Sequence, residues 1–299
     1  MNILVSGDSI LDTIISGSIK SNYASDFRTI HVVNTQNYLG GAANVANNLS
    51  ALNAKVTLAG TIGLDEGGSK FLELLDATKI KKENFFRLYE KPTTHKTRIC
   101  DKEKTIIRFD IEDSSVIDLK LNNFSDKYDA VVISDYAKGF VTEKLIEKIK
   151  HIPIIVANPK PTNIELYKGL NATVIILNKQ ELIDSYRHVF DLEIFNWDRI
   201  QDLAMELRDY LKCKHLLITL SELGMNLYPE NIHINALSKD IVDVCGCGDT
   251  TTSTLAYGLC RGLSIQESMK LANIAAAIAV QKFGTSVVTL KELEEYDCN

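Results

Sequence analysis

The chain has 299 residues, of which 45% are hydrophobic, and its formal net charge is −6. A chain of this size can bury a large core in one domain or two. Its acidic balance argues weakly against nucleic-acid binding, which usually needs a basic face. No apolar run reaches membrane-spanning length, and the N-terminus lacks the basic region of a signal peptide. Six cysteines in so long a chain do not resemble a disulfide framework, so we expect a cytoplasmic protein without membrane contact.

Short apolar runs rich in β-branched residues alternate with helical patterns along the chain. Residues 2–7 predict a buried strand, 40–54 a helix and 55–63 a second strand. The alternation continues with strands at 129–134, 152–157, 172–177 and 215–220, a helix at 197–211, and a capping box at 264–267 that opens the last long helix. It predicts an α/β fold with a mainly parallel sheet covered on both faces, in which ligands bind at the carboxyl ends of the strands.

Two regions break this pattern, because residues 13–39 and 93–112 alternate polar and apolar side chains like hairpin or edge strands. A turn is expected at 101–104. These regions hold too few apolar residues for a core of their own, so we interpret them as one small sheet inserted over the cleft, a lid or a dimer contact. A pair of solvated edge strands fits the pattern nearly as well.

The segment "DVCGCGD", Asp243 to Asp249, allows two interpretations. A metal site needs about four ligands, whereas Cys245 and Cys247 form only a C-x-C pair with no histidine nearby. The glycines instead favour an anion cradle: a strand at 241–244 would enter the turn, and a helix would start near Asp249 or Thr250, leaving backbone N–H groups free. Asp249 could then accept a proton from an attacking hydroxyl, or it could simply cap the helix.

Other polar motifs follow predicted strands. Asp8 and Asp12 could bind sugar hydroxyls, and a glycine pair at 40–41 opens a helix beside Asn44, although a tight turn with caps explains these residues as well. "NKQE", at 178–181, could hold magnesium through its waters or could form a capping box. Basic side chains near the expected cleft suit a phosphorylated substrate, although most such residues are solvated surface charge: Lys96, Arg98, Arg108, Lys138 and Lys160.

Together, "GDSILD", "GGAAN", "NKQE" and "DVCGCGD" resemble, in this order, the motifs of the ribokinase-type (PfkB) carbohydrate kinase family, over nearly the whole chain. Within that family, "GGAANVANNLSALNAKV", "SDYAKG" and "KFGTS" are most similar to the heptose 7-phosphate kinases of ADP-heptose biosynthesis. The resemblance implies a single domain over 1–299, a Rossmann-like αβα sandwich with a β-sheet lid inserted from about 13–39 and 93–112. It also implies a homodimer formed through the lid.

The implied reaction is ATP- and Mg²⁺-dependent phosphorylation of the C1 hydroxyl of D-glycero-D-manno-heptose 7-phosphate, giving the 1,7-bisphosphate for ADP-heptose, lipopolysaccharide or a related surface glycan. The alternatives are a kinase for another sugar or sugar phosphate, and a non-catalytic relative that binds sugar and nucleotide. Many relatives fuse this kinase to a nucleotidyltransferase, and since the chain ends at Asn299 we expect a separate protein to supply that activity.

The family's functional residues carry over by position. Asp249 corresponds to the catalytic base, and the anion hole corresponds to Gly246, Cys247 and Gly248. The sugar site is expected to contain Asp8, Asp12, Gly40, Gly41, Asn44, Arg108 and Lys138. The nucleotide is expected near Thr219, Ser221, Gly224, Asn273 and Ala276. Mg²⁺ is assigned to Asn178 and Glu181, and a monovalent cation, K⁺, to Asp243, Gly284 and Ser286.

The chain departs from the family pattern at several positions. Cys245 and Cys247 replace a threonine and an alanine, and Asn158 replaces an aspartate. Residues 22–31 read "NYASDFRTIH" where the heptose kinases have a proline-rich run, which motivates the alternative of a different sugar. Because Cys247 lies at a helix N-terminus, we expect its thiol to be unusually acidic and sensitive to thiol reagents, with ATP protecting it.

Overall fold

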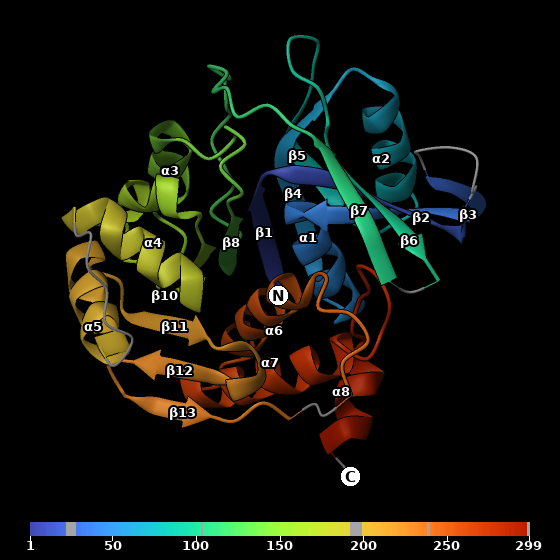
Figure 1. Cartoon of the computed structure of the whole chain (residues 1–299). Coiled ribbons are helices and arrows are strands. Elements are labelled where there is room, and N and C mark those ends of the chain that lie inside the picture. The colour runs from blue at the N-terminus through green and yellow to red at the C-terminus, as the bar shows by residue number, and fades with distance from the viewer. Residues whose placement is uncertain (22–27, 103, 192–198, 238–239, 298–299) are drawn as a thin grey trace.

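The computed structural model describes residues 1–21, 28–102, 104–191, 199–237 and 240–297. Its main sheet contains the strands β1 (Asn2–Gly7), β4 (Lys55–Gly63), β5 (Lys81–Leu88), β8 (Ala130–Ser134), β9 (Ile154–Asn158), β10 (Val174–Asn178), β11 (His215–Thr219), β12 (Met225–Tyr228) and β13 (Ile232–Ile234). Their order is β13-β12-β11-β10-β9-β8-β1-β4-β5, and the run from β11 to β5 is parallel (Figure 1). The α/β class predicted from the sequence is confirmed, with two antiparallel strands added at one edge.

Helices cover both faces of the main sheet (Figure 1). One face packs against α1 (Ala42–Ala51), α2 (Glu66–Asp76), α6 (Cys247–Cys260), α7 (Ile265–Ala279) and α8 (Leu290–Asp297). The other packs against α3 (Glu143–Ile149), α4 (Lys179–Phe190), α5 (Ile200–Leu211) and the 3-10 helix η1 (Pro161–Tyr167). Every residue of β8 is buried, as expected for a strand covered twice. Burial of each large apolar side chain stabilises the fold by about 1.5–3 kcal/mol.

The local signals in the sequence are reproduced at several helix ends. Ser264 and Glu267 form the expected capping box at the start of α7. The predicted helix at 197–211 is found as α5, with residues 197–198 outside the described part of the chain. Among the described residues, no helix combines the length and the hydropathy that a membrane crossing requires.

The strand expected at 241–244 is a wrong prediction. This segment forms no strand; the N–H groups of Val242 and Asp243 both donate to the carbonyl of Val280 at the end of α7, at 2.8 and 3.1 Å. Two of the apolar residues of 241–244, which suggested a buried strand, are explained by a cavity that they line. Ile241 and Val244 line a cavity instead of entering the sheet.

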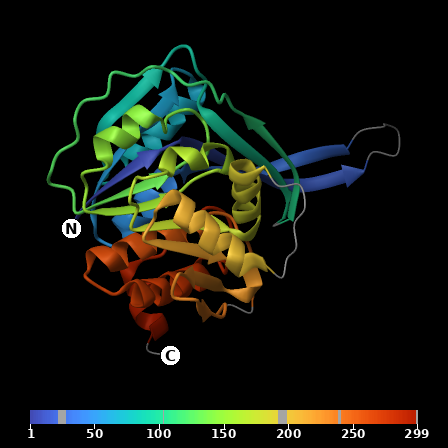
Figure 2. The ribbon, with the colours of Figure 1, turned by 90° about the vertical axis from the view of Figure 1, so that its left-hand side faces the viewer.

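A second, four-stranded sheet lies beside the main one, and we call it the lid sheet. It consists of β2 (Ser9–Ser21), β3 (Arg28–Gly41), β6 (Thr94–Asp101) and β7 (Lys104–Ile111) in the order β3-β2-β6-β7. The regions singled out at 13–39 and 93–112 thus pair with each other, through the parallel contact of β2 with β6. Figure 2 shows β2 and β3 projecting from the body of the molecule as a long hairpin.

Candidate active site

Asp249 lies in the first turn of α6, where it is only 6% exposed. The helix begins at Cys247, slightly earlier than expected, and the preceding Gly246 has a left-handed backbone with φ of 74°. A Cβ atom at position 246 would lie 2.9 Å from Nδ2 of Asn44, so the sharp entry into α6 requires glycine for space as well as for conformation. The motif therefore places a carboxylate at the positive end of a helix.

Two hydrogen bonds hold the Asp249 carboxylate. Asn44 Nδ2 donates to Oδ2 at 2.8 Å, and the Tyr136 hydroxyl donates to Oδ1 at 3.0 Å. Burial raises the pKa of Asp249 to about 6, although both hydrogen bonds act in the opposite direction. A carboxylate with such a pKa can accept a proton near neutral pH, which suits a general base.

The predicted anion cradle, Gly246 to Gly248, forms the entry to α6. Its first-turn N–H groups have no partner within the helix, as in any helix N-terminus, but that of Cys247 donates to the Val244 carbonyl at 3.2 Å. The expected acidity of the Cys247 thiol is wrong. Burial raises its pKa, and the neighbouring Asp249 carboxylate acts in the same direction. The effect of the helix terminus is outweighed because the sulfur is removed from water.

Asp8 was assigned to the sugar, and the structure places it beneath the loop that follows β8. Its Oδ2 accepts from the N–H groups of Tyr136 at 2.8 Å and Lys138 at 3.0 Å, while Oδ1 accepts from Phe140 at 3.2 Å. Asp8 is 2% exposed. These contacts organise the loop, because a single carboxylate ties three of its amides together.

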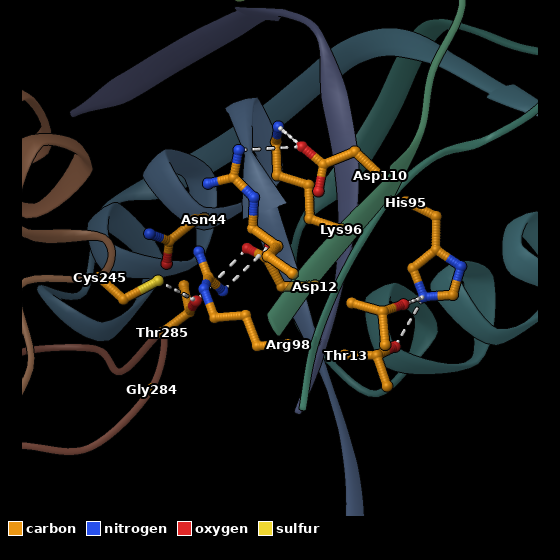
Figure 3. A network of polar contacts seen from close by, with 12 residues as sticks. Asp12, Thr13, Asn44, His95, Lys96, Arg98, Asp110, Cys245, Gly284 and Thr285 are labelled. Atoms are coloured by element: carbon orange, nitrogen blue, oxygen red, sulfur yellow. Dashed lines mark hydrogen bonds and ion pairs between the residues drawn. The ribbon is translucent and has the colours of Figure 1, made fainter. Parts of the chain in front are cut away.

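Asp12, on β2 of the lid sheet, lies close to Arg98 and Thr285 (Figure 3). Its Oδ1 is 3.6 Å from Arg98 Nη1, and its Oδ2 accepts from Thr285 Oγ1 at 3.4 Å. Gly40 allows this arrangement, since a Cβ there would lie 2.4 Å from Oδ2 of Asp12. Gly41 brings the chain into α1, whose first N–H, at Ala42, donates to the Asp8 carbonyl at 2.9 Å.

Charged side chains of the lid sheet and its neighbours gather next to Asp12 (Figure 3). Asp110 Oδ2 is 3.1 Å from both Lys96 Nζ and Arg108 Nη2, and Lys138 Nζ is 2.9 Å from Glu112 Oε2. Three buried atoms in this cluster have no hydrogen-bond partner among the described residues: Asp12 Oδ1, Arg98 Nη1 and Asp110 Oδ1. Asp12 Oδ1 and Arg98 Nη1 form an ion pair with each other at 3.6 Å, which is too long for a hydrogen bond, so a polar ligand could complete the hydrogen bonding of the cluster.

A cavity of about 540 Å³ opens on the other side of the α6 N-terminus. All five residues predicted to contact the nucleotide line it: Thr219, Ser221, Gly224, Asn273 and Ala276. Cys247 and Gly248 also line it, so the cavity reaches the predicted anion cradle. The Asn273 side chain already makes one hydrogen bond within the protein, because its Nδ2 donates to the Asn235 carbonyl at 2.8 Å.

Asn178 and Glu181 form the capping box that the sequence allowed as an alternative to a magnesium site. Asn178 Oδ1 accepts from the Glu181 N–H at 2.8 Å, and Glu181 Oε2 accepts from the Asn178 N–H at 2.9 Å. Lys160 Nζ donates to the other oxygen, Oε1, at 2.5 Å. Within the described part of the chain, no group of three or more His, Cys, Asp or Glu side chains is arranged to hold a metal ion.

Asp243 joins two of the segments assigned to a monovalent cation. Its Oδ1 accepts from the Cys245 N–H and its Oδ2 from the Gly284 N–H, both at 3.0 Å.

Sequence reasoning missed Thr285, which contacts both Asp12 and the Cys245 thiol, and it missed Tyr136. Both lie in segments already quoted for the resemblance, "KFGTS" and "SDYAKG", so their proximity to named motifs was the available signal.

The model of the pfkB family of carbohydrate kinases matches residues 13–292. The chain belongs to this family. The expected enzyme class, an ATP-dependent carbohydrate kinase, is confirmed at this level. Among curated proteins, the chain is 32% identical to the bifunctional protein HldE of Sulfurimonas denitrificans over 99% of its length, and 36% identical to that of Pasteurella multocida over 98%. It spans 64% and 62% of the length of these relatives.

Solved structures share the fold at low sequence identity. The ribokinase of Thermotoga maritima superposes with a TM-score of 0.77 at 20% identity, covering 99% of both chains. Phosphofructokinase-2 of Escherichia coli, solved with substrates and products, also gives 0.77, at 15% identity, covering 100% of this chain and 98% of the other. These matches confirm the ribokinase-like fold.

Proposed function

We propose that this protein transfers the γ-phosphoryl group of ATP to the C1 hydroxyl of D-glycero-D-manno-heptose 7-phosphate. The observation that carries the proposal is the position of Asp249, between the 540 Å³ cavity and the charged cluster of the lid sheet. The similarity to the HldE proteins supports a heptose phosphate as the acceptor. The cations of the cluster match a substrate that already carries a phosphate.

In this mechanism the sugar lies between the lid sheet and α6, and ATP lies in the cavity. Asp249 accepts the proton of the attacking hydroxyl as the new O–P bond forms, and the bond between the γ-phosphorus and the bridging oxygen of ADP breaks. The N–H groups at the start of α6 would stabilise the negative charge on the transferred group, except that of Cys247, which already donates to the Val244 carbonyl. The N–H of Gly248 and the helix dipole supply this potential without rearrangement.

The family implies a divalent cation, and the residues fit Mg²⁺ held through water. Both Glu181 oxygens already accept hydrogen bonds, from the Asn178 N–H and from Lys160, so direct ligation would displace the capping box. Mg²⁺ commonly retains several of its waters in proteins. Asn178 and Glu181 would therefore hold hydrated Mg²⁺, which would neutralise phosphate charge. We likewise propose that Asp243, Gly284 and Ser286 hold K⁺.

We also propose that the lid sheet forms a homodimer contact. Its two edge strands, β3 and β7, expose large apolar side chains: Val32, Val33, Ile106, Ile107, Phe109 and Ile111. Val33 is 82% exposed and Phe109 is 48% exposed. Exposed edges of this kind are usually protected by pairing or by cover.

The test is a panel of sugars and sugar phosphates in a coupled ADP-release assay with MgATP, in which phosphorus NMR locates the new phosphate. We expect the highest kcat/KM with the heptose 7-phosphate, and a new signal at C1. Asp249→Asn protein serves as the control for ATPase contamination. Preference for an unphosphorylated sugar, or phosphorylation at another carbon, would contradict the assignment.

A further inference from the structure

Tyr136 lies between the candidate base, Asp249, and Lys160, which forms an ion pair with Glu181. Its hydroxyl donates to Asp249 Oδ1 at 3.0 Å. On the face of its ring lies the ammonium group of Lys160, 5.2 Å from the ring centroid, and this lysine is paired with Glu181. A single aromatic side chain thus connects the base on α6 with the capping box at the start of α4.

The backbone that carries Tyr136 is held from two sides. Asp8 accepts hydrogen bonds from the N–H groups of residues 136, 138 and 140. From the other side, the buried Lys91 ammonium donates to the carbonyls of Lys138 and Ser115. Gly139 is required here, because a Cβ atom would lie 2.2 Å from the Ser115 carbonyl oxygen. The loop therefore fixes where the phenol ring can lie.

The surroundings of Tyr136 also fix its protonation state. Burial raises the pKa of its hydroxyl well above the usual value, and the nearby carboxylates of Asp249, Asp12 and Glu181 act in the same direction. The phenol consequently keeps its proton throughout the physiological pH range. It donates to Asp249 at every pH at which the enzyme would work.

We propose that Tyr136 is a positioning residue for Asp249. Its hydroxyl holds Oδ1 in place, so that a remaining lone pair of the carboxylate faces the acceptor hydroxyl. The same hydrogen bond favours the ionised form of the carboxylate. Asn44 fixes the other oxygen, and each carboxylate oxygen can accept more than one hydrogen bond, so both anchors leave room for the substrate. Hydrogen bonds to the charged form oppose the effect of burial. This inference rests on the proposed function only in naming Asp249 as the base.

The first experiment is Tyr136→Phe, which removes the hydroxyl and keeps the ring beneath Lys160. We expect kcat to fall by about 10- to 100-fold, as for the loss of one hydrogen bond to a charged group, with the KM of both substrates little changed. Without this donor the pKa of Asp249 should rise, so the acidic limb of the kcat profile should move to higher pH. The deficit should accordingly be larger at pH 6.5 than at pH 8.5.

Tyr167→Phe is the matched control. Its hydroxyl donates to Asp135 Oδ2 at 2.9 Å, so it removes the same kind of buried tyrosine–aspartate hydrogen bond, but not at the base. We expect this variant to leave the acidic limb in place. An equal displacement of the limb in both variants would overturn the proposal, because it would reflect general loosening of the loop.

A second measurement does not depend on turnover. Carbon NMR of ¹³C-labelled aspartate side chains gives the pKa of Asp249, assigned by its absence in Asp249→Asn protein. We expect a rise in Tyr136→Phe and, with the more acidic 3-fluorotyrosine at position 136, a fall. An unchanged pKa in both proteins would overturn the role of Tyr136. Absence of turnover with every sugar phosphate would instead contradict the proposed function, while the NMR titration would still decide the role of Tyr136.

Discussion

The carboxylates at the lid sheet and those beside the main sheet are held in different ways. At the main sheet, both oxygens of Asp8 and both oxygens of Asp249 accept hydrogen bonds from the protein. At the lid sheet, Asp12 and Asp110 each keep one buried oxygen without a hydrogen bond, and Arg98 keeps one such nitrogen. The carboxylates of Asp8 and Asp249 are thus fully hydrogen-bonded within the protein, whereas the charged cluster of the lid sheet combines ion pairs with unused hydrogen-bonding atoms.

This difference separates two tasks. Groups that stabilise developing charge work best when they are oriented before the reaction, and the loop after β8 and the first turn of α6 provide that order. Groups that recognise a substrate gain specificity when their buried polar atoms find partners only in the correct complex. We therefore expect changes at α6 to affect kcat and changes on the lid sheet to affect the KM of the sugar.

The largest effect is expected from Asp249→Asn. The amide has nearly the same shape but cannot accept the proton, so kcat should fall by about 10²- to 10⁴-fold. ATP binding by calorimetry and the thermal midpoint should stay close to wild type. The control is Asp126→Asn, whose side chain is 96% exposed. Near-normal turnover in Asp249→Asn protein would remove the base from the mechanism.

Arg98→Gln tests the lid side of the comparison. We expect the KM for the sugar phosphate to rise by about 10- to 100-fold, because a charged donor next to Asp12 is lost, while the KM for ATP stays unchanged. Arg199→Gln, on the exposed surface before α5, is the matched control. A parallel rise in the KM for ATP would show that the two regions are not separate.

The pH dependence tests the base directly. Since burial raises the pKa of Asp249 to about 6 and the base must be ionised, kcat should be constant at high pH and fall as pH drops below about 6. The slope should approach about tenfold per pH unit. Rates are measured at saturating substrates, with phosphorus NMR used to follow the titration of the substrate phosphates. A limb near pH 4 would contradict the effect of burial.

Phe109→Asp and Val33→Asp test the lid sheet as a dimer contact. Light scattering of the wild type should give about twice the chain mass of 33.3 kDa, and the variants should give the mass of one chain, since a charge cannot be buried cheaply in an apolar contact. Leu263→Asp, in the connection between α6 and α7, should leave the mass unchanged. A monomeric wild type would exclude the contact.

The smallest effect is expected from Cys247→Ala. In the unsubstituted protein, the raised pKa keeps the Cys247 thiol protonated, so iodoacetamide should modify it slowly. ATP should slow this alkylation further, because Cys247 lines the cavity. Turnover of the Cys247→Ala variant should remain close to wild type, since the backbone N–H groups are retained. Peptide mass spectrometry measures the modification. Rapid alkylation of Cys247 would show that the thiol is acidic after all.

Much of the fold and part of the site could be predicted from local sequence. The strands that became β1, β4 and β8 were evident because a strand covered on both faces must be continuously apolar. The capping box at Ser264 is decided by residues three positions apart. The residues that the family resemblance assigned to the nucleotide line one cavity, with Thr219 at the end of β11 and Asn273 and Ala276 on α7.

Other features depended on contacts between distant segments. The segment 241–244 has the pattern of a strand, but its partner proved to be the end of α7. The pKa of the Cys247 thiol rises because other segments exclude water from it. Residues 22–27, part of the departure in the lid sequence, lie outside the described residues.

The sequence by itself determined the parallel strands β1, β4, β8, β9, β10 and β11 and the turn at Gly246 that leads into α6, because these follow from hydrophobic periodicity and glycine conformation over a few residues. It gave no signal for β5, β12 and β13. Only the tertiary structure decided that Asp8 organises a loop and that Tyr136 contacts Asp249, 113 residues away in the chain. Hydrogen bonds between such distant residues exist only once the sheet has placed the ends of β1 and β8 beside α6. Local patterns do not specify which of these residues come into contact.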